Sequence, residues 1–491
     1  MKITKKILTL VLAFAMLFAF AVQSFAVNES FWWKTWGSGE SITMFVGSNE
    51  SERNFSWYSD YESSPTDERC PKVIISTNKD LTSPQIFKGY CTEAVRRVVD
   101  DTTIIENGYV NKVTVTDLKE NTTYYYQCKS ENFESDIYSF KTDSKSEFSA
   151  MYVTDVHITA IDDANENSLS DTSYRLHQTL EDALEKNKNI SLLLSAGDQA
   201  TEGLESEYKA FSVSPLLSGI SVATAMGNHD RKGGAYKLFK NVPNEDEEAL
   251  IHSYNGTDYW FTKGEALFLV MDSNSGNAMA HADFVKRAIK ANPDVKWKIM
   301  MFHHDLYSGR IEHRESENNL LRTIWGPIAD EFGIDLVLLG HSHYYTITDV
   351  LYKNVRVEKL QKEMVDPKGT IYAVSCSLGR PRDDDDLGLN EEWIGAEYLT
   401  DTATYFILDF KSDSITVNSY ELGGETPINS FTIKKTSQNG GHEDTGFFTS
   451  IKDGVVRFLG AIYTIFNNFN SCDDLKERGY DAELSDFFGT N

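Results

Sequence analysis

Between residues 148 and 340, short apolar runs alternate with segments of helical periodicity, and this alternation constrains the fold more than any other feature. The apolar runs cover residues 149–154, 190–195, 220–226, 266–271, 297–302 and 334–339. Between the first two runs, one helical face would carry Leu176, Leu180, Ala183 and Leu184. Near-continuous apolar strands that alternate with helices predict a buried sheet covered by helices, so we expect an α/β domain.

Four later runs of strand character follow without helices between them. They lie at residues 370–374, 403–409, 414–420 and 429–434. We expect these strands to complete a second sheet of the same domain. The predicted architecture for residues 148–435 is therefore an α/β (α+β) sandwich of two sheets flanked by helices.

Polar side chains that commonly bind metals follow five of the apolar runs directly. They are Asp155 and His157, Asp198, the run Asn228-His229-Asp230, the pair His303-His304, and His341 with His343. Because the carboxyl ends of parallel strands meet at one edge of a sheet, we expect these groups to share a crevice. Histidine, carboxylate and amide ligands without a thiolate suit zinc, iron or manganese. Without a cation, such a cluster would cost several kcal/mol, so the pattern predicts a metal centre.

The ordered set Asp-x-His, Gly-Asp, Gly-Asn-His-Asp, His and Gly-His-x-His resembles the signature of the calcineurin-like metallophosphoesterase superfamily. The resemblance is close from residue 149 to about 350 and looser to about 435. It implies a metal-dependent phosphoric ester hydrolase with two metal ions, and Asp198 would bridge them. One metal would take Asp155, His157, Asp198 and His343, and the other Asp198, Asn228, His303 and His341.

Two divalent cations against Asp155 and Asp198 would leave positive charge in the crevice, which suits a small phosphorylated substrate. We expect a hydroxide that bridges the metals to attack phosphorus. His229, oriented by Asp230, is the candidate general acid for the leaving group, with support of a metal ligand as the alternative. His304, Tyr307 and Arg310 are candidate substrate contacts, or else ordinary loop and packing residues.

The leading hypothesis is hydrolysis of phosphate monoesters, as in an acid phosphatase, although the ligand set is the same for monoesters and diesters. A phosphodiesterase or nucleotidase activity on the same metal centre is the enzymatic alternative. A non-catalytic protein that binds phosphate polymers or cell-wall components is the alternative of a different class.

Residues 28–145 show short alternating stretches at 41–46, 72–77, 110–115 and 122–127, each flanked by turn residues. This spacing predicts an all-β sandwich of the immunoglobulin or fibronectin-III type. The segments 118–127 and 139–142 resemble the fibronectin-III-like domain that precedes the catalytic domain of purple acid phosphatases.

Two positions depart from the purple acid phosphatase pattern. The first motif of those enzymes has Gly where this chain has His157, and their tyrosine ligand is replaced here by Thr201. Without that tyrosine, the purple tyrosinate–iron colour should be missing. The metals, whether iron, zinc or manganese, are therefore left open.

The two ends of the chain carry predictions of their own. Residues 1–26 have a basic start, an apolar run and a small-residue cleavage site, so they predict a signal peptide and a secreted or cell-surface protein. Residues 436–446 read as a linker, and 447–491 as a C-terminal tail with an amphipathic helix. That helix would dock on the protein's own surface or contact a membrane surface or a partner. The formal net charge of −27 argues against general binding to nucleic acids.

Overall fold

The computed structural model covers most of the two predicted regions. The described residues are 41–59, 70–93, 97–99, 102–104, 108–159, 169–246, 258–307, 317–381 and 391–437. The predicted signal peptide, the C-terminal tail, Arg310 and all but the first two residues of the linker lie outside them. None of the helices in these ranges is long and apolar enough to cross a membrane.

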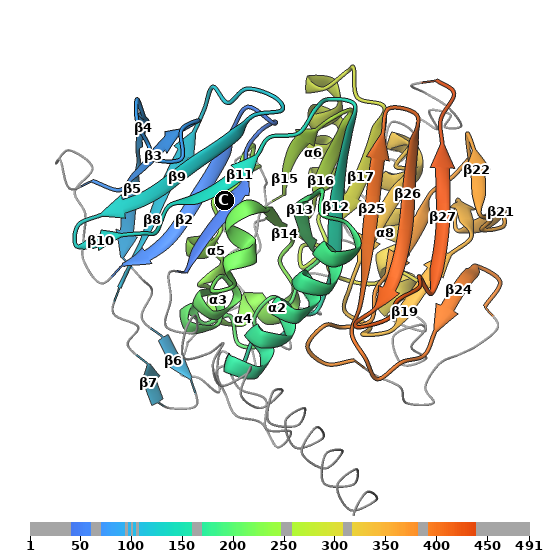
Figure 1. Ribbon diagram of the computed structural model, residues 1–491. Helices are drawn as coiled ribbons and strands as arrows, with labels where there is room; N and C mark the ends of the chain where they lie inside the picture. The colour runs from blue at the N-terminus through green and yellow to red at the C-terminus, as the bar shows by residue number, and fades with distance from the viewer. Residues whose placement is uncertain are drawn as a thin grey trace, which may run out of the picture.

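The N-terminal region is built from strands that form two packed layers (Figure 1). One layer has the order β1-β2-β8-β5 and the other β10-β9-β3-β4, with β11 also on β9. Large side chains such as Trp57, Tyr126 and Phe140 fill the space between the layers, and their burial stabilises this β-rich domain. The strands are β1 (Ile42–Val46), β2 (Arg53–Ser59), β3 (Lys72–Ser76), β4 (Gln85–Lys88), β5 (Tyr90–Glu93), β6 (Arg97–Val99), β7 (Thr102–Ile104), β8 (Tyr109–Val115), β9 (Thr123–Ser130), β10 (Phe133–Glu134) and β11 (Tyr138–Lys141).

A first long sheet crosses the second region in the order β22-β27-β26-β25-β12-β13-β14. Its strands β12, β13 and β14 run parallel, and β25 joins β12 in the antiparallel sense. The sheet then continues into the N-terminal region, because β1 pairs with β14 in parallel with Phe45 opposite Val222. The strands of the second region are β12 (Glu147–Val153), β13 (Ile190–Ser195), β14 (Ser221–Thr224), β22 (Glu363–Val365), β25 (Thr404–Lys411), β26 (Ser414–Glu421) and β27 (Asn429–Lys434).

A second sheet of the same region has the order β15-β16-β17-β18-β23-β19-β24. Its strands β16, β17, β18 and β23 are parallel, so their carboxyl ends lie along one edge. A separate hairpin pairs β20 with β21. The strands are β15 (Tyr259–Lys263), β16 (Ala266–Val270), β17 (Trp297–Met301), β18 (Leu336–Leu339), β19 (Tyr345–Thr348), β20 (Val350–Tyr352), β21 (Val355–Glu358), β23 (Ile371–Val374) and β24 (Ile394–Tyr398).

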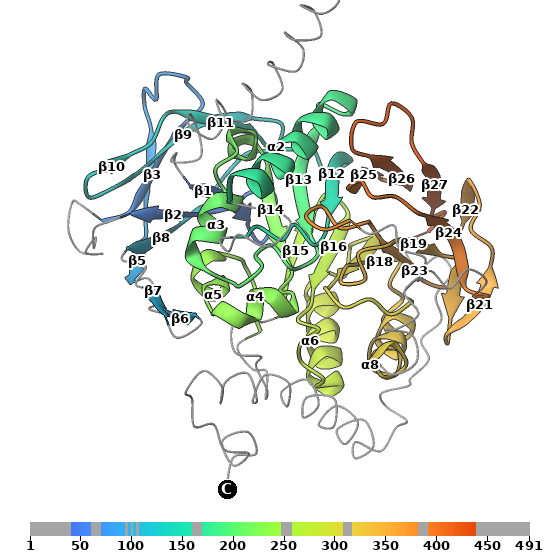
Figure 2. The ribbon, with the colours of Figure 1, turned by 90° about the horizontal axis from the view of Figure 1, so that it is seen from below.

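Helices cover the outer faces of these two sheets. Figure 2 shows α6 and α8 side by side next to the second sheet, and α2 with α3 near β13 and β14. The predicted apolar face of α2 is buried at Leu176, Leu180 and Ala183. The helices are α2 (Leu169–Lys186), α3 (Glu205–Phe211), α4 (Asn228–Gly233), α5 (Tyr236–Phe239), α6 (Ala278–Ala291) and α8 (Glu317–Phe332), with a 3₁₀ turn, η2 (Pro215–Gly219).

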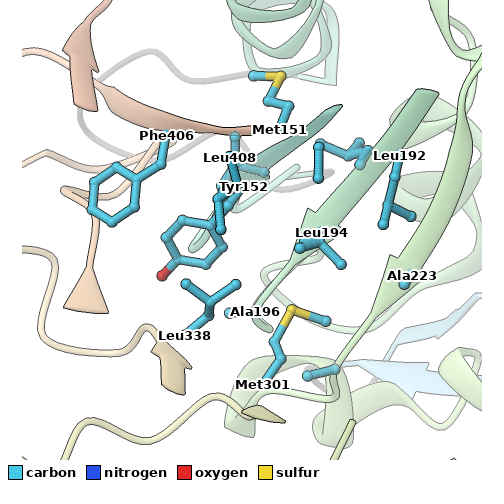
Figure 3. Close-up of a cluster of buried hydrophobic side chains, with 14 of the residues drawn as sticks. Met151, Tyr152, Leu192, Leu194, Ala196, Ala223, Met301, Leu338, Phe406 and Leu408 are labelled. Atoms are coloured by element: carbon cyan, nitrogen blue, oxygen red, sulfur yellow. The ribbon is translucent and has the colours of Figure 1, made fainter. Parts of the chain in front are cut away.

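The main core lies between the two sheets. Figure 3 shows Tyr152 and Leu194 of the first sheet near Met301 and Leu338 of the second. The predicted two-sheet metallophosphoesterase-like architecture is confirmed. The later strands were expected to complete the second sheet, and of the four only β23 does so. β23 joins the second sheet and β25 to β27 extend the first, because β25 pairs with the otherwise open side of β12.

Candidate metal centre

The predicted metal ligands all lie in loops that leave the carboxyl ends of central strands. Asp155 and His157 follow β12, Asp198 follows β13, and Asn228 follows β14. His303 follows β17, while His341 and His343 follow β18. Three ligands therefore arise from the second sheet and four from the first, and they gather where the carboxyl edges of the two sheets meet.

Five of these seven residues have a backbone conformation that non-glycine residues rarely adopt. Their φ angles are positive: 52° at Asp155, 48° at His157, 51° at Asp198, 74° at His341 and 65° at His343. Each such residue costs roughly 1–3 kcal/mol, and such strain concentrates at functional sites. The surrounding packing therefore holds these loops in an unfavourable backbone conformation that directs the predicted ligand side chains toward one another.

Two motif glycines let these loops approach one another. A side chain at Gly227 would place its Cβ 2.0 Å from Asp198 Oδ1, and one at Gly197 would place it 2.4 Å from His303 Nδ1. Gly197 also has a φ of +100°. The glycines of the Gly-Asp and Gly-Asn-His-Asp motifs thus allow ligands from different strands to come together.

The first half of the site gathers four ligand atoms. His343 Nε2 lies 3.2 Å from Asp155 Oδ1, and His157 Nε2 lies 3.1 Å from His343 Nε2. His157 Nε2 is also 3.7 Å from Asp198 Oδ2. These separations suit atoms that surround one cation, and Asp155, His157 and His343 form a group able to hold a metal.

The second half uses the same oxygen of Asp198. His303 Nε2 lies 3.3 Å from Asp198 Oδ2 and 3.0 Å from Asn228 Oδ1. His341 Nδ1 is 3.2 Å from Asn228 Oδ1. Since Asp198 Oδ2 faces His157 on one side and His303 on the other, it occupies the position of a bridging ligand.

The electrostatics of the cluster call for a positive charge. Burial alone would raise the pKa of Asp155 and Asp198, but the neighbouring imidazoles His343 and His303 outweigh it and lower both. Burial would lower the pKa of His303, yet Asp198 raises it to about 10. Asp155 Oδ1 is buried and accepts no hydrogen bond from any described residue. Both carboxylates are therefore arranged to stay ionised beside a cation, so the ligand set fits metal ions.

Two of the imidazoles are held by their other ring nitrogen. His303 Nδ1 lies 2.9 Å from the Ala196 carbonyl oxygen, and His343 Nδ1 lies 2.9 Å from the Arg380 carbonyl oxygen. A ring that donates from Nδ1 presents the lone pair of Nε2 to a metal. Burial lowers the pKa of His157 well below its usual value, which keeps this ring neutral and able to ligate.

His229 lies beside the cluster, but its orientation differs from the prediction. Its Nδ1 is 2.8 Å from the Thr201 carbonyl oxygen, and its ring meets that of His157 edge-on at 4.8 Å. Asp230 does not orient it. The fully buried Asp230 carboxylate instead accepts hydrogen bonds from the Gly227, Gln199 and Ala200 amides and from the Tyr208 hydroxyl. Asp230 therefore ties the loops after β13 and β14 together.

The predicted substrate contacts fare differently. His304 is buried, with its ring 4.8 Å from that of His341. Tyr307 is also buried, but its hydroxyl donates to Asn354 Oδ1 and its ring packs on Tyr372. Tyr307 thus belongs to a second hydrophobic core, which lies between the second sheet and helices α6 and α8, rather than to the ligand cluster. Arg310 lies outside the described residues.

Sequence reasoning missed two loops that support the ligands. Ser273 and Asn274 follow β16, and Ser377 follows β23, so two further strands contribute to this edge. Ser273 lies 2.8 Å from His304 Nδ1, and Ser377 donates to the Asp155 carbonyl oxygen. The run Asp272-Ser-Asn-Ser275 at a strand end was an available signal, because it repeats the strand-then-polar pattern of the ligands.

Two family models match the chain. Residues 149–345 match the calcineurin-like phosphoesterase model, and residues 40–142 match the N-terminal domain of purple acid phosphatase. No curated protein sequence matches the chain.

The solved structures with a similar fold include the following two. A purple acid phosphatase, PPD1, from yellow lupin (Lupinus luteus) seeds aligns at 16% identity with a TM-score of 0.65, over 81% of this chain and 75% of its own. PhoD aligns at 10% identity with a TM-score of 0.50, over 87% of this chain and 98% of its own. The chain thus contains a calcineurin-like phosphoesterase domain behind a purple acid phosphatase N-terminal domain and is a metal-dependent phosphoester hydrolase. Its fold implies a dinuclear metal centre.

Proposed function

For a calcineurin-like phosphoesterase domain behind a purple acid phosphatase N-terminal domain, we propose hydrolysis of phosphate monoesters at the paired sites around Asp198. The single observation that carries this proposal is that Asp198 Oδ2 faces both His157 and His303. One bridging oxygen holds two cations close together, which is the arrangement of a two-metal hydrolytic site. The resemblance to an acid phosphatase favours monoesters as the substrate class.

Two cations bound here would supply Lewis acidity and a water molecule of lowered pKa for in-line attack on phosphorus. Asp155, Asp198 and the imidazoles would hold the cations, and the cations would in turn bind the phosphoryl oxygens. Because the centre would retain positive charge after neutralising the two carboxylates, it attracts an anionic ester despite the acidic chain. Asp155, His157, Asp198, His303 and His343 are buried, and low exposure strengthens electrostatic interactions at their ligand atoms, whereas Asn228 and His341 are partly exposed.

His229 is the residue proposed to protonate the leaving group. Its Nδ1 faces the Thr201 carbonyl oxygen, so this nitrogen carries a proton and the opposite nitrogen, Nε2, is left to exchange one with a substrate oxygen. His229 also forms a group with His157 and Asp198 whose ligand atoms lie within 4.8 Å of one another. This proximity puts the ring within reach of a bound ester.

A further part of the proposal concerns the metal ligands, because Thr201 replaces a tyrosine ligand. It stands where purple acid phosphatases place their tyrosine ligand, and its buried Oγ1 has no hydrogen-bond partner among the described residues. We therefore expect iron-loaded protein to lack the purple tyrosinate absorption. Metal analysis together with a visible spectrum checks this, and a strong visible band would contradict it.

The location of the protein also belongs to this proposal. The apolar start of the chain supports export and cleavage of residues 1–26, which would place the enzyme outside the cytoplasm or at the cell surface. The amphipathic pattern of 447–469 supports contact of the C-terminal helix with a membrane surface. N-terminal sequencing of the secreted protein tests the first statement, and a vesicle-binding assay with and without residues 447–491 tests the second.

The central experiment is a turnover assay with 4-nitrophenyl phosphate and bis(4-nitrophenyl) phosphate, on metal-loaded and chelator-treated protein. We expect the monoester to be hydrolysed faster, and only by the loaded protein. Faster hydrolysis of the diester would replace the monoester proposal by the phosphodiesterase alternative. Failure of the loaded protein to turn over either substrate would contradict the catalytic proposal.

A further inference from the structure

The two halves of the metal centre are supported by two different loops. The loop 375–380, which follows β23, contacts the first half, and the loop 272–275, which follows β16, contacts the second. Neither loop supplies a predicted metal ligand. Their hydrogen bonds instead reach the residues that do, or the residues directly beside them.

The loop 375–380 packs against the turn that carries Asp155 and His157. Ser377 Oγ donates to the Asp155 carbonyl oxygen at 2.8 Å, and the Gly379 amide donates to the same oxygen at 2.9 Å. A Cβ at Gly379 would lie 2.2 Å from the Val156 carbonyl oxygen, so the loop fits tightly there. The Arg380 carbonyl oxygen accepts from His343 Nδ1. The loop therefore bonds to Asp155 and His343 and packs against Val156, which lies between Asp155 and His157.

The loop 272–275 is placed in the same way beside the second half. The buried Ser273 Oγ accepts from the His304 amide at 3.1 Å and lies 2.8 Å from His304 Nδ1. The His304 ring in turn packs against two ligand rings, with its centroid 5.3 Å from that of His303 and 4.8 Å from that of His341. A serine that binds both the backbone and the ring of His304 fixes this imidazole between two ligands.

Asn274 connects the same loop to the third ligand of the second half. Its Nδ2 donates to the Met226 carbonyl oxygen at 3.2 Å, two residues before Asn228. It also donates to Asp272 Oδ1 at 2.9 Å. Asp272 is tied through its amide to Asp258, whose carboxylate lies 2.5 Å from His281 Nδ1. This buried network holds the loop in place from behind.

From these contacts we propose that the two metal positions are tuned independently, with Ser377 as a positioning residue for the first and Ser273 and Asn274 for the second. The inference rests on the dinuclear centre proposed above. Asp198, the shared ligand, is held by a third unit, since its Oδ1 accepts from the His229 amide. Loss of an outer-shell hydrogen bond typically lowers metal affinity about 10- to 100-fold.

The test is a metal titration of the metal-free full chain, with zinc or manganese and a competing chromogenic chelator, so that each binding step is resolved. Ser273→Ala and Ser377→Ala are a matched pair, because both hydroxyls are fully buried. We expect each variant to weaken a different step by about 10-fold or more. Asp155→Asn and Asn228→Ala identify which step belongs to which half.

Ser342→Ala is the control. Its buried Oγ lies between two ligands in sequence and makes no hydrogen bond to any described residue, so neither step should change. Ser273→Thr, which keeps the hydroxyl, should restore the second step. Thermal unfolding of the metal-free variants separates a folding defect from weaker binding, and Asn274→Ala replaces Ser273→Ala if that variant does not fold.

The inference is overturned if Ser273→Ala and Ser377→Ala weaken the same step, weaken both steps equally, or leave both unchanged. These outcomes are independent of turnover. If the wild type binds two metals in separable steps but hydrolyses no ester, the proposed function fails while the inference stands.

Discussion

Two of the charge clusters among the described residues, both at least partly buried, are completed in opposite ways. The junction cluster, made of Glu50, Arg53, Asp143 and Lys263, lies where the two regions meet. Glu50 pairs with Arg53 at 2.5 Å and with Lys263 at 2.7 Å, and Lys263 pairs with Asp143 at 2.7 Å. Two acids face two bases, so this cluster is neutral by its own side chains.

The metal centre has no such balance. Asp155 and Asp198 face imidazoles, and the described residues around their ligand atoms include no lysine or arginine paired with them. Buried carboxylates are stable where lysine or arginine side chains neutralise them, and they need a bound cation where no such side chain is present. The junction cluster therefore helps to hold the two regions together, whereas the metal centre is suited to bind cations.

The largest expected effect is that of Asp198→Ala, which removes the shared ligand. We expect turnover to fall by at least about 10³-fold, because both metals lose the oxygen that holds them together. Metal analysis should show fewer than two ions per chain. If Asp198→Ala retained both metals and normal turnover, Asp198 would not be the shared ligand, and the metal centre would not differ from the junction cluster in its need for a cation.

His229→Ala tests a residue of the metal centre that is proposed to act in catalysis without binding a metal. Loss of a general acid typically costs about 10²- to 10⁴-fold in turnover, and we expect a decrease in that range. Metal content should stay at the wild-type level, since the His229 ring is not among the proposed ligands. A substrate with a good leaving group, such as 4-nitrophenyl phosphate, should be affected less than an alkyl phosphate. Equal losses for both substrates would contradict the acid role.

Lys263→Met tests the junction cluster. It leaves the partly buried carboxylates of Glu50 and Asp143 without the cation they share, although Arg53 still pairs with Glu50, so the free energy of unfolding should fall by about 1–3 kcal/mol. Metal content and turnover of the folded variant should remain close to wild type. Lys129→Met is the matched control, because Lys129 pairs with Glu134 at the surface and should cost no more than about 1 kcal/mol. Urea denaturation measures both.

A similarly small expected effect is the loss of stability at low pH that follows from protonation of Glu50. Burial would raise the pKa of Glu50, but Lys263 and Arg53 outweigh it and lower the pKa from 4.5 to about 2. A lowered pKa contributes stability that is complete above about pH 4.5 and is lost as the pH falls through about 2. We expect this contribution to reach about 2–3 kcal/mol. Unfolding curves at pH 6 and pH 3 should show less dependence on pH in Glu50→Gln than in wild type, and an unchanged dependence would contradict this.

The arrangement of the centre could be predicted because few alternatives exist for polar residues at the ends of parallel strands. Asp155, Asn228 and His303 follow apolar runs that had to be buried, so their meeting at one edge followed from chain direction alone. The direction of a side chain within a loop does not follow from such rules. Asp230 was expected to face its neighbour His229, yet it turns to backbone amides of the preceding loop.

Tertiary packing decided the other differences. Tyr307 follows a ligand strand, as a substrate contact would, but a position beside Tyr372 buries its ring in the second core. The later strands were expected to complete the second sheet, but β25 pairs with β12 and so belongs to the first sheet, together with β26 and β27. Neither the competing apolar contact nor the unsatisfied strand edge is visible in the local sequence.

The pairing of β1 with β14 has a consequence for how the molecule can be divided. With β1 in place, β14 is an interior strand with neighbours on both sides. A chain shortened to the phosphoesterase region would expose the backbone amides and carbonyls of residues 221–224, and a bare strand edge recruits other chains. Removal of the N-terminal region would therefore cause self-association at a smaller perturbation than any loss of catalysis. The N-terminal region thus also keeps the phosphoesterase region soluble.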